Sequence, residues 1–147
     1  MAALFTAVSM FRASPAAASA FLAKNRHAEG VRETASGLQY KVLMAGAGAR
    51  PTDADVAVVT YRGTLVDGTA FDESRRPVPM PVAGVIPGFA EGLKLMQTGA
   101  RYRLWIGPDL GYGSRATGPI PAHSVLVFDV DLVAVQRATP NLEGRPR

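Results

Sequence analysis

The side chains that could carry polar chemistry are few in this chain, and their spacing fits no familiar reaction. Cysteine is absent, and the two histidines, His27 and His123, lie far apart in the sequence. Thiol catalysis, disulfides and cysteine-ligated metal sites are therefore excluded, and we expect no histidine-based metal site. The chain also lacks the G-x-x-x-x-G-K-[ST] phosphate loop and the G-x-S-x-G nucleophile motif. The sequence thus gives no support to phosphoryl transfer or to hydrolysis by an activated serine.

One motif resembles a cofactor site. Residues 111–116 match the dinucleotide fingerprint G-x-G-x-x-A, which works only where it opens a helix whose N-terminus faces the pyrophosphate. Pro119 and Pro121 follow closely, and two prolines so near each other do not continue a helix. We therefore predict a loop here, and no cofactor.

What remains is a set of aromatic and aliphatic residues at strand ends and in loops, with a single acid, Asp72, among them. Such a set suits an apolar cleft with very few polar groups, and it does not suit reactions that need a nucleophile, a base or a metal. The apolar members are Tyr61, Phe71, Val85, Ile86, Phe89, Tyr112, Ile120 and Phe128.

The net charge of +4 does not indicate nucleic-acid binding. Residues 1–30 and 136–147 each carry a net charge of +2, whereas residues 31–135 hold ten basic and ten acidic side chains. A nucleic-acid binder needs clustered cations that displace counterions from phosphates. No run of 18 apolar residues occurs either, so the sequence predicts no membrane span.

Two helices are expected to frame the body of the chain. Ser14 followed by Pro15 is typical of a helix start, which predicts a helix over residues 15–27 that ends before Gly30. Residues 88–97 are expected to form a short amphipathic helix with Phe89, Leu93 and Met96 on its apolar stripe.

Strands are expected at 38–44, 56–63, 101–106 and 124–135, with a turn at Asp67 and Gly68. Asp129 and Asp131 share one face of the last strand, which predicts a solvated face and a sheet covered on one side only. Trp105 points to the same side, where we expect it to pack against the N-terminal segment or a partner. The predicted fold is α+β: a bent antiparallel sheet, or half-barrel, wrapped around one short helix, with an extra N-terminal helix.

The chain divides into three parts. Residues 1–36 form an N-terminal helical segment, and the small-x-small sequence at 18–20 also fits the cleavage site of a signal or leader. Residues 37–135 form the globular domain, and residues 136–147 form a polar tail that we expect to be flexible.

Three stretches resemble the FKBP family, the macrolide-binding peptidyl-prolyl cis–trans isomerases: TYRGTLVDGTAFDES (60–74), VIPGFAEGLKLMQTGARYRLWIGPDLGYG (85–113) and IPAHSVLVFDVDLV (120–133). Residues 21–31 with 34–43 are similar to the segment that enters the isomerase domain in bacterial macrophage-infectivity-potentiator-like members. The resemblance implies an isomerase of X–Pro bonds that needs no cofactor. It also implies the fold described above.

The resemblance also implies roles for particular residues. Asp72 and Tyr112 would be the catalytic polar groups, with Asp72 at the buried edge of the cleft near the imide. Phe89 would be the floor under the proline ring, and the Ile86 amide the donor to a substrate carbonyl. The remaining walls would be Tyr61, Phe71, Val85, Ile120 and Phe128.

The chain departs from the family at a few positions. The family commonly has tryptophan at the floor, where this chain has Phe89, and a second proline where it has Ala122. The loop over residues 73–78 is short, and Val78 or Met80 stands where an aromatic wall is usual. These departures bear on macrolide affinity more than on the fold.

The expected partners are proline-containing unfolded or folding polypeptides, with macrolides as inhibitors. We expect a monomer or weak dimer in the periplasm, with the cytoplasm as the alternative location. The alternative function is a non-catalytic prolyl-binding or chaperone module.

Overall fold

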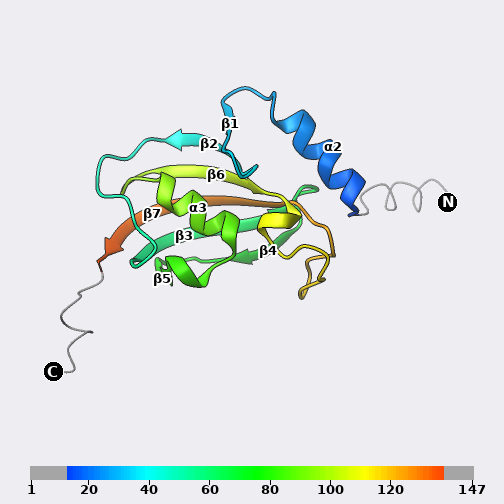
Figure 1. Cartoon of the computed structure of the whole chain (residues 1–147). Helices are drawn as coiled ribbons and strands as arrows, with labels where there is room; N and C mark the ends of the chain where they lie inside the picture. The colour runs from blue at the N-terminus through cyan, green and yellow to red at the C-terminus, as the bar shows by residue number, and fades with distance from the viewer. Residues whose placement is uncertain (1–12, 138–147) are drawn as a thin grey trace.

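The computed structural model describes residues 13–137, and they form two α-helices, two short 3-10 helices (Val82–Gly84 and Pro108–Leu110) and one curved antiparallel sheet (Figure 1). Residues 1–12 and 138–147, which include most of the expected leader and tail, lie outside the described range. The α-helices are α2 (Pro15–Asn25) and α3 (Pro87–Leu95). The strands are β1 (Val31–Glu33), β2 (Gln39–Met44), β3 (Val56–Leu65), β4 (Ala70–Glu73), β5 (Val78–Pro81), β6 (Arg101–Ile106) and β7 (Leu126–Gln136).

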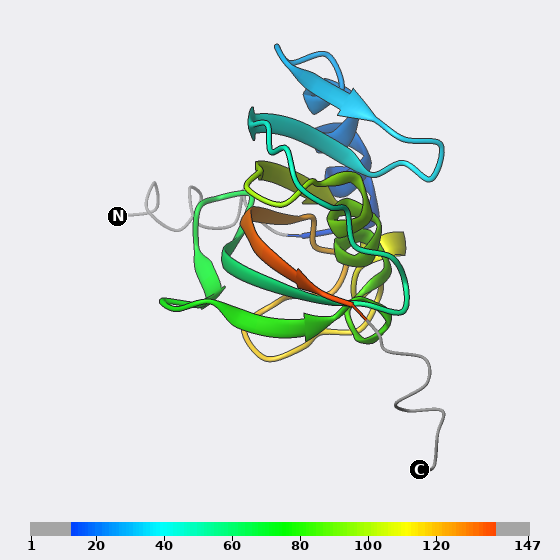
Figure 2. The same ribbon diagram turned by 90° about the vertical axis from the view of Figure 1, so that its left-hand side faces the viewer.

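The strands pair in the order β1-β2-β6-β7-β3-β4, and β5 pairs with β3 beyond the point where β4 ends. All of the pairs are antiparallel. The sheet curves around α3 (Figure 2), which confirms the expected architecture. The strands β1, β4 and β5 were not predicted, because each has only three or four residues and β5 contains two prolines. Pro79 and Pro81 are tolerated because β5 pairs on one side only.

The main core lies between α3 and the concave face of the sheet. Phe89, Leu93 and Met96 are buried, as the apolar stripe predicts. Gly88 and Gly92 let the helix approach β6, since a Cβ at Gly92 would lie 2.5 Å from a methyl group of Leu104. The alternating residues Leu126, Phe128, Val130 and Leu132 of β7 complete this core.

The convex face is partly covered, so the expectation of a sheet covered on one side only is wrong for the part under α2. Trp105 is 8% exposed and forms a second buried cluster with Ala18 and Val125, against which Phe21 and Leu22 pack. This confirms the predicted contact between Trp105 and the N-terminal segment. The apolar side chains at this end of β6 and β7 make such a cover favourable.

Beyond the helix the same face is polar, as predicted, but its acids are paired. Arg101 binds Asp131 with a distance of 2.6 Å from Nε to Oδ1, and Arg103 binds Asp129 at 2.7 Å. These are cross-strand pairs of β6 and β7, directly opposite each other in the register.

The start of α2 is fixed as the sequence predicts. The Ser14 hydroxyl accepts a hydrogen bond of 3.0 Å from the Ala17 amide, and Pro15 opens the helix. A buried glutamine attaches the helix to the sheet, because Gln39 Nε2 donates to the Leu22 carbonyl at 2.9 Å.

Candidate active site

Four aromatic rings predicted to line a cleft converge on one another, and we refer to Tyr61, Phe71, Phe89 and Phe128 as the ring cluster. The centroids of Phe89 and Phe128 are 4.9 Å apart with the rings nearly perpendicular, and Phe71 meets Phe128 in the same way at 5.5 Å. Tyr61 lies 6.2 Å from Phe89 and 6.3 Å from Phe128. Edge-to-face contacts of this kind are favourable beyond the area that they bury.

The rings come from both layers of the fold. Phe89 stands on α3, whereas Tyr61, Phe71 and Phe128 stand on β3, β4 and β7. Phe89 and Phe128 are buried, while Tyr61 and Phe71 keep part of their surface in solvent. The cluster therefore has a closed floor and an accessible edge.

A glycine makes room for the rings. Gly63 of β3 lies opposite Phe128 in the register, and a Cβ placed on it would come within 2.7 Å of both Phe128 and Phe71. Reasoning from the sequence did not single out this residue. A glycine inside a run of β-branched residues is nevertheless a recognised signal that another group approaches the backbone closely.

Tyr61 and Asp72 form the polar part of the site. The Tyr61 hydroxyl donates to Asp72 Oδ2 at 2.8 Å, and the Glu73 amide donates to Asp72 Oδ1 at 2.8 Å. Burial, followed by the hydrogen bond and the charge of Asp72, raises the pKa of Tyr61 to about 12. The phenol is therefore protonated throughout the physiological range.

Asp72 itself is exposed, so the expectation of an acid at a buried edge is wrong. The reason is its position on β4, a short strand at the edge of the sheet whose partner is β3 alone. Ionised carboxylates only accept hydrogen bonds. Asp72 is thus suited to orient a donor and unsuited to donate to a carbonyl.

Ser74 holds the backbone of Tyr61, a role that no sequence pattern indicated. The Tyr61 amide donates to Ser74 Oγ at 3.0 Å, and the Ser74 amide donates to the Tyr61 carbonyl at 2.9 Å. These two bonds continue the pairing of β3 with β4 past the end of β4, and so fix the strand on which the phenol stands.

The start of α3 offers a hydrogen-bond donor beside the rings. Val85 and Ile86 are half-buried and pack on the core that contains the ring cluster. Ile86 caps α3 with an extended backbone, and its amide has no hydrogen-bond partner within residues 13–137. Pro87 follows at the first helical position, where no donor is available. The Ile86 amide is therefore a donor at this end of α3 that a substrate carbonyl could use.

The loop between β6 and β7 carries the last two expected residues. Ile120 is buried in the same core as the rings, whereas Tyr112 is 38% exposed. Tyr112 also contributes to the raised pKa of Tyr61, which places the two phenols within electrostatic range. As predicted, no helix follows the G-x-G-x-x-A sequence, since residues 111–114 form turns and Thr117 bridges to Ile120.

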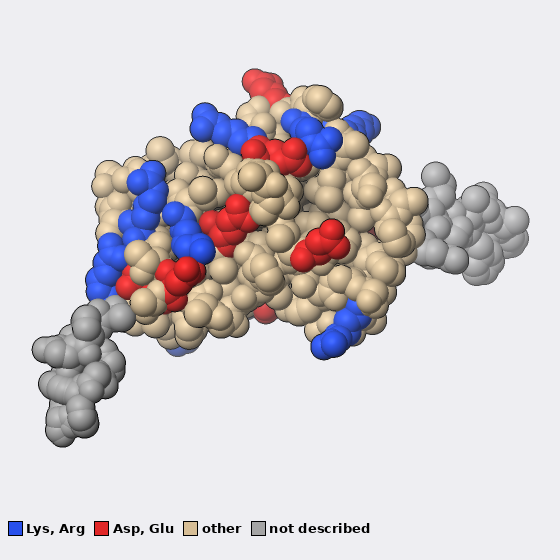
Figure 3. All heavy atoms as spheres, in the orientation of Figure 1, with Lys and Arg blue, Asp and Glu red and all other residues tan. Residues whose placement is uncertain are grey.

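The charge distribution of the surface fits an apolar site. The face that carries α3 is largely uncharged, and basic side chains gather at the end where β7 finishes (Figure 3).

Among the described residues, no group of three or more histidines, cysteines or acids is placed to hold a metal ion. No helix within this range is long and apolar enough to span a membrane.

Comparisons with known proteins agree with this arrangement. Residues 48–133 match the sequence profile described as FKBP-type peptidyl-prolyl cis-trans isomerase, and residues 7–42 match that of the domain amino-terminal to such isomerases. A protein named FKBP-type peptidyl-prolyl cis-trans isomerase FkpA, from Aeromonas hydrophila, is 46% identical over 120 residues, which cover 80% of this chain and 45% of that protein. Outer membrane protein MIP from Legionella longbeachae is 42% identical over 123 residues, covering 81% and 53%.

One solved structure is similar to this chain over almost the whole length of the solved protein. The crystal structure of a peptidyl-prolyl cis-trans isomerase from Pseudomonas syringae superposes with a TM-score of 0.81 at 35% identity, covering 84% of this chain and 93% of that one. By contrast, the chain spans about half the length of the curated relatives just described.

Proposed function

The chain belongs to the family of FKBP-type peptidyl-prolyl cis-trans isomerases, and we propose that it accelerates rotation about X–Pro bonds in unfolded or folding polypeptides. The convergence of the ring cluster beside the free Ile86 amide is the observation that carries this proposal. We expect a preference for an apolar residue before proline, because that residue would meet the rings.

The reaction needs no nucleophile and no cofactor. Rotation breaks no covalent bond, and its barrier of about 18–20 kcal/mol comes from the partial double bond of the planar imide. Uncatalysed exchange takes tens to hundreds of seconds. Reducing about 100 s to about 10 ms requires roughly 5–6 kcal/mol of transition-state stabilisation, at about 1.36 kcal/mol per decade.

The ring cluster supplies part of this transition-state stabilisation by excluding water. The twisted imide has lost its conjugation, so its carbonyl is less dipolar than that of the planar ground state. An apolar surface built from Tyr61, Phe89 and Phe128 disfavours the planar form relative to water, because the planar form loses more solvation there.

Directed hydrogen bonds supply the rest of the transition-state stabilisation. The Ile86 amide and the Tyr112 hydroxyl bind carbonyls that flank the proline and hold the chain while the imide turns. Asp72 contributes by orienting the Tyr61 phenol, because both of its oxygens already accept hydrogen bonds from the chain. Its role in this proposal is therefore positioning and electrostatic.

A direct assay of cis–trans exchange in proline tetrapeptides tests the proposal. We expect acceleration at nanomolar to micromolar protein, and titration with a macrolide measures how far Phe89 and the short 73–78 loop weaken inhibition. Tyr40→Phe is a suitable control variant, since Tyr40 stacks on Tyr102 at the β2–β6 pair and takes no part in the ring cluster. No acceleration at micromolar protein would overturn the enzymatic proposal. Client binding without turnover would then support the non-catalytic prolyl-binding module.

We further propose that the protein works in the periplasm as a monomer or weak dimer. Support for the location comes from the similarity to a relative named an outer membrane protein. Support for weak association comes from α2, whose apolar side chains Ala18, Phe21 and Leu22 are already used against Trp105. Fractionation of the native host and sedimentation with and without residues 1–30 test the two statements.

A further inference from the structure

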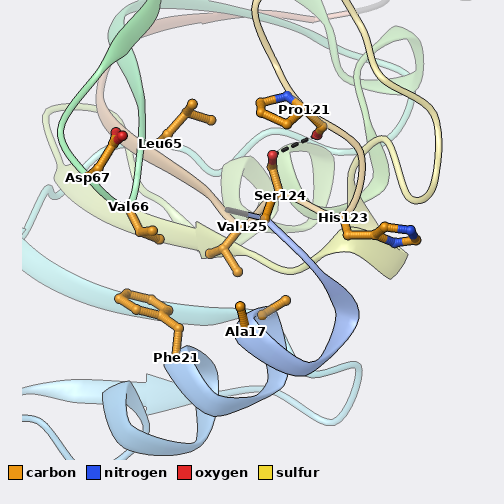
Figure 4. Close-up of a pocket in the computed structure, with 11 residues that line it drawn as sticks. Ala17, Phe21, Leu65, Val66, Asp67, Pro121, His123, Ser124 and Val125 are labelled. Carbon is orange, nitrogen blue, oxygen red and sulfur yellow. Dashed lines mark hydrogen bonds between the residues drawn. The ribbon is translucent and has the colours of Figure 1, made fainter. Parts of the chain in front are cut away.

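A hollow lies between α2, the β3–β4 turn and the loop that leads into β7, away from the ring cluster (Figure 4). Its volume is about 120 Å³. Phe21, Val66 and Val125 gather around it, whereas the His123 ring points away from this group. An engineered apolar cavity of about 150 Å³ holds one benzene molecule. The hollow is therefore of the size that accepts a single aromatic ring.

The hollow exists because α2 begins with small residues. Helices often start with a contact between an apolar residue just before the N-cap and one at the fourth helical position. With Ser14 as the N-cap, these positions are Ala13 and Ala18, and both line the hollow. Two methyl groups do not fill the space that a larger pair would occupy. Val66 is consequently 47% exposed at the tip of the turn.

The residues that immediately precede α2 have the chemistry to fill it. Ala13 lies in the wall of the hollow, and Ser14 is extended, with φ of −160° and ψ of 162°. Phe11 is two residues before Ala13, so its Cα can lie no more than about 7 Å from the Cα of Ala13.

Charge at the rim favours the same occupant. Asp67 lines the hollow, and its Oδ1 accepts a hydrogen bond of 2.9 Å from the Thr69 amide. Arg12, between Phe11 and Ala13, is the sole charged residue among the first twelve. An exposed ion pair adds little stability, but this one would orient the segment.

We propose that the hollow binds the Phe11 side chain of the same molecule, with Arg12 facing Asp67. This contact fastens the residues before α2 to the β3–β4 turn and to the loop of residues 121–125. That loop continues directly from Ile120, which packs in the core shared with the ring cluster. Attachment of the N-terminal segment thereby supports a wall of the proposed active site from the opposite side.

Methyl and aromatic NMR spectra of the full chain test this proposal. We expect cross-relaxation between the Phe11 ring and the methyl groups of Val66 and Val125. Phe11→Ala should shift these methyl signals and lower Tm by about 3–8 °C, on the scale of one lost buried ring. Phe5→Ala is the matched control, because it removes the same side chain farther from α2, and it should leave both methyl signals in place.

Benzene provides a second measurement that does not depend on Tm. It should shift the Val66 and Val125 methyl signals in Phe11→Ala, where the hollow is vacant, and much less in the unmutated chain. Equal benzene shifts in the two proteins would overturn the proposal. So would methyl signals that change with protein concentration and not with Phe11→Ala, since a second copy would then be the occupant.

Discussion

The hydroxyl of Tyr61 donates a hydrogen bond of 2.8 Å to Oδ2 of Asp72, an exposed carboxylate on the edge strand β4. The remaining oxygen of Asp72 accepts from the Glu73 amide in the same strand. The carboxylate is thus held from both sides, and it fixes the direction of a phenol that belongs to the ring cluster. In the polar part of the site, Asp72 therefore serves to position the Tyr61 phenol, and its carboxylate is not a free acid.

Removing the polar groups should weaken catalysis without unfolding the protein. We expect Asp72→Ala and Tyr112→Phe each to lower kcat/KM by up to about tenfold, because a hydrogen bond contributes roughly 0.5–1.5 kcal/mol. Both residues are exposed, so circular dichroism and Tm should change little. Full activity in both variants would show that the polar assignments are wrong. Asp72→Asn, which keeps an acceptor for Tyr61 and removes the charge, separates orientation from electrostatics.

Adding one methyl group at Gly63 should disturb the rings directly. In Gly63→Ala the new Cβ would lie 2.7 Å from atoms of Phe71 and Phe128, so the rings must move. Overpacking of this kind typically costs about 1–3 kcal/mol of stability, and we expect kcat/KM to fall together with Tm. The matched control is Gly68→Ala, where nothing lies within 4 Å and only the positive φ of 93° is strained. Loss of activity in the control alone would contradict the role given to Gly63.

Stability should fall at high pH through Tyr61. Burial and Asp72 raise the pKa of this phenol from 10.0 to about 12, so the folded protein keeps a proton that the unfolded chain releases near pH 10. The contribution to the free energy of unfolding is therefore complete below pH 10 and is lost as pH rises toward 12. Urea unfolding at pH 8 and pH 11.5 measures the loss, which should be smaller in Tyr61→Phe. Equal losses in the two proteins would argue against the raised pKa.

The end of β7 should contribute to stability through an ion pair with a buried acid. Arg137 Nη1 lies 2.5 Å from Oδ2 of Asp55, which is 4% exposed and also accepts hydrogen bonds from Thr52. We expect Arg137→Ala to lower the free energy of unfolding by about 1.5–3 kcal/mol, because a hydrogen bond to a buried charge is lost. Arg101→Ala removes an exposed pair and should cost no more than about 1 kcal/mol. Urea unfolding of both variants checks this order.

The long, strongly patterned elements could be predicted from the sequence. Alternation identified β3, β6 and β7, and the spacing of Phe89, Leu93 and Met96 identified α3. The short strands β1, β4 and β5 could not be predicted, because three or four residues carry too little periodicity and their pairing depends on β2 and β3. The pattern also did not show that Arg101 and Arg103 would pair with the acids of β7, since that requires the register between two strands.

The rings of the site could be predicted from residue type and from the family resemblance, whereas the residues that hold the rings in place could not. Tyr61, Phe71, Phe89 and Phe128 were expected to meet, and they do. Ser74 was missed because its two hydrogen bonds to Tyr61 depend on the path of the chain after β4. The exposure of Asp72 was missed for a similar reason, as only the strand order shows that β4 is an edge.

Trp105 is the one tryptophan of the chain, and it is buried beneath α2 on the face of the sheet opposite the ring cluster. Its fluorescence should therefore report whether the N-terminal helix is attached, with emission moving to longer wavelength when the indole meets water. Binding of a prolyl peptide at the rings should leave this signal nearly unchanged. The molecule thus contains a built-in optical reporter that separates undocking of its helix from occupation of its active site.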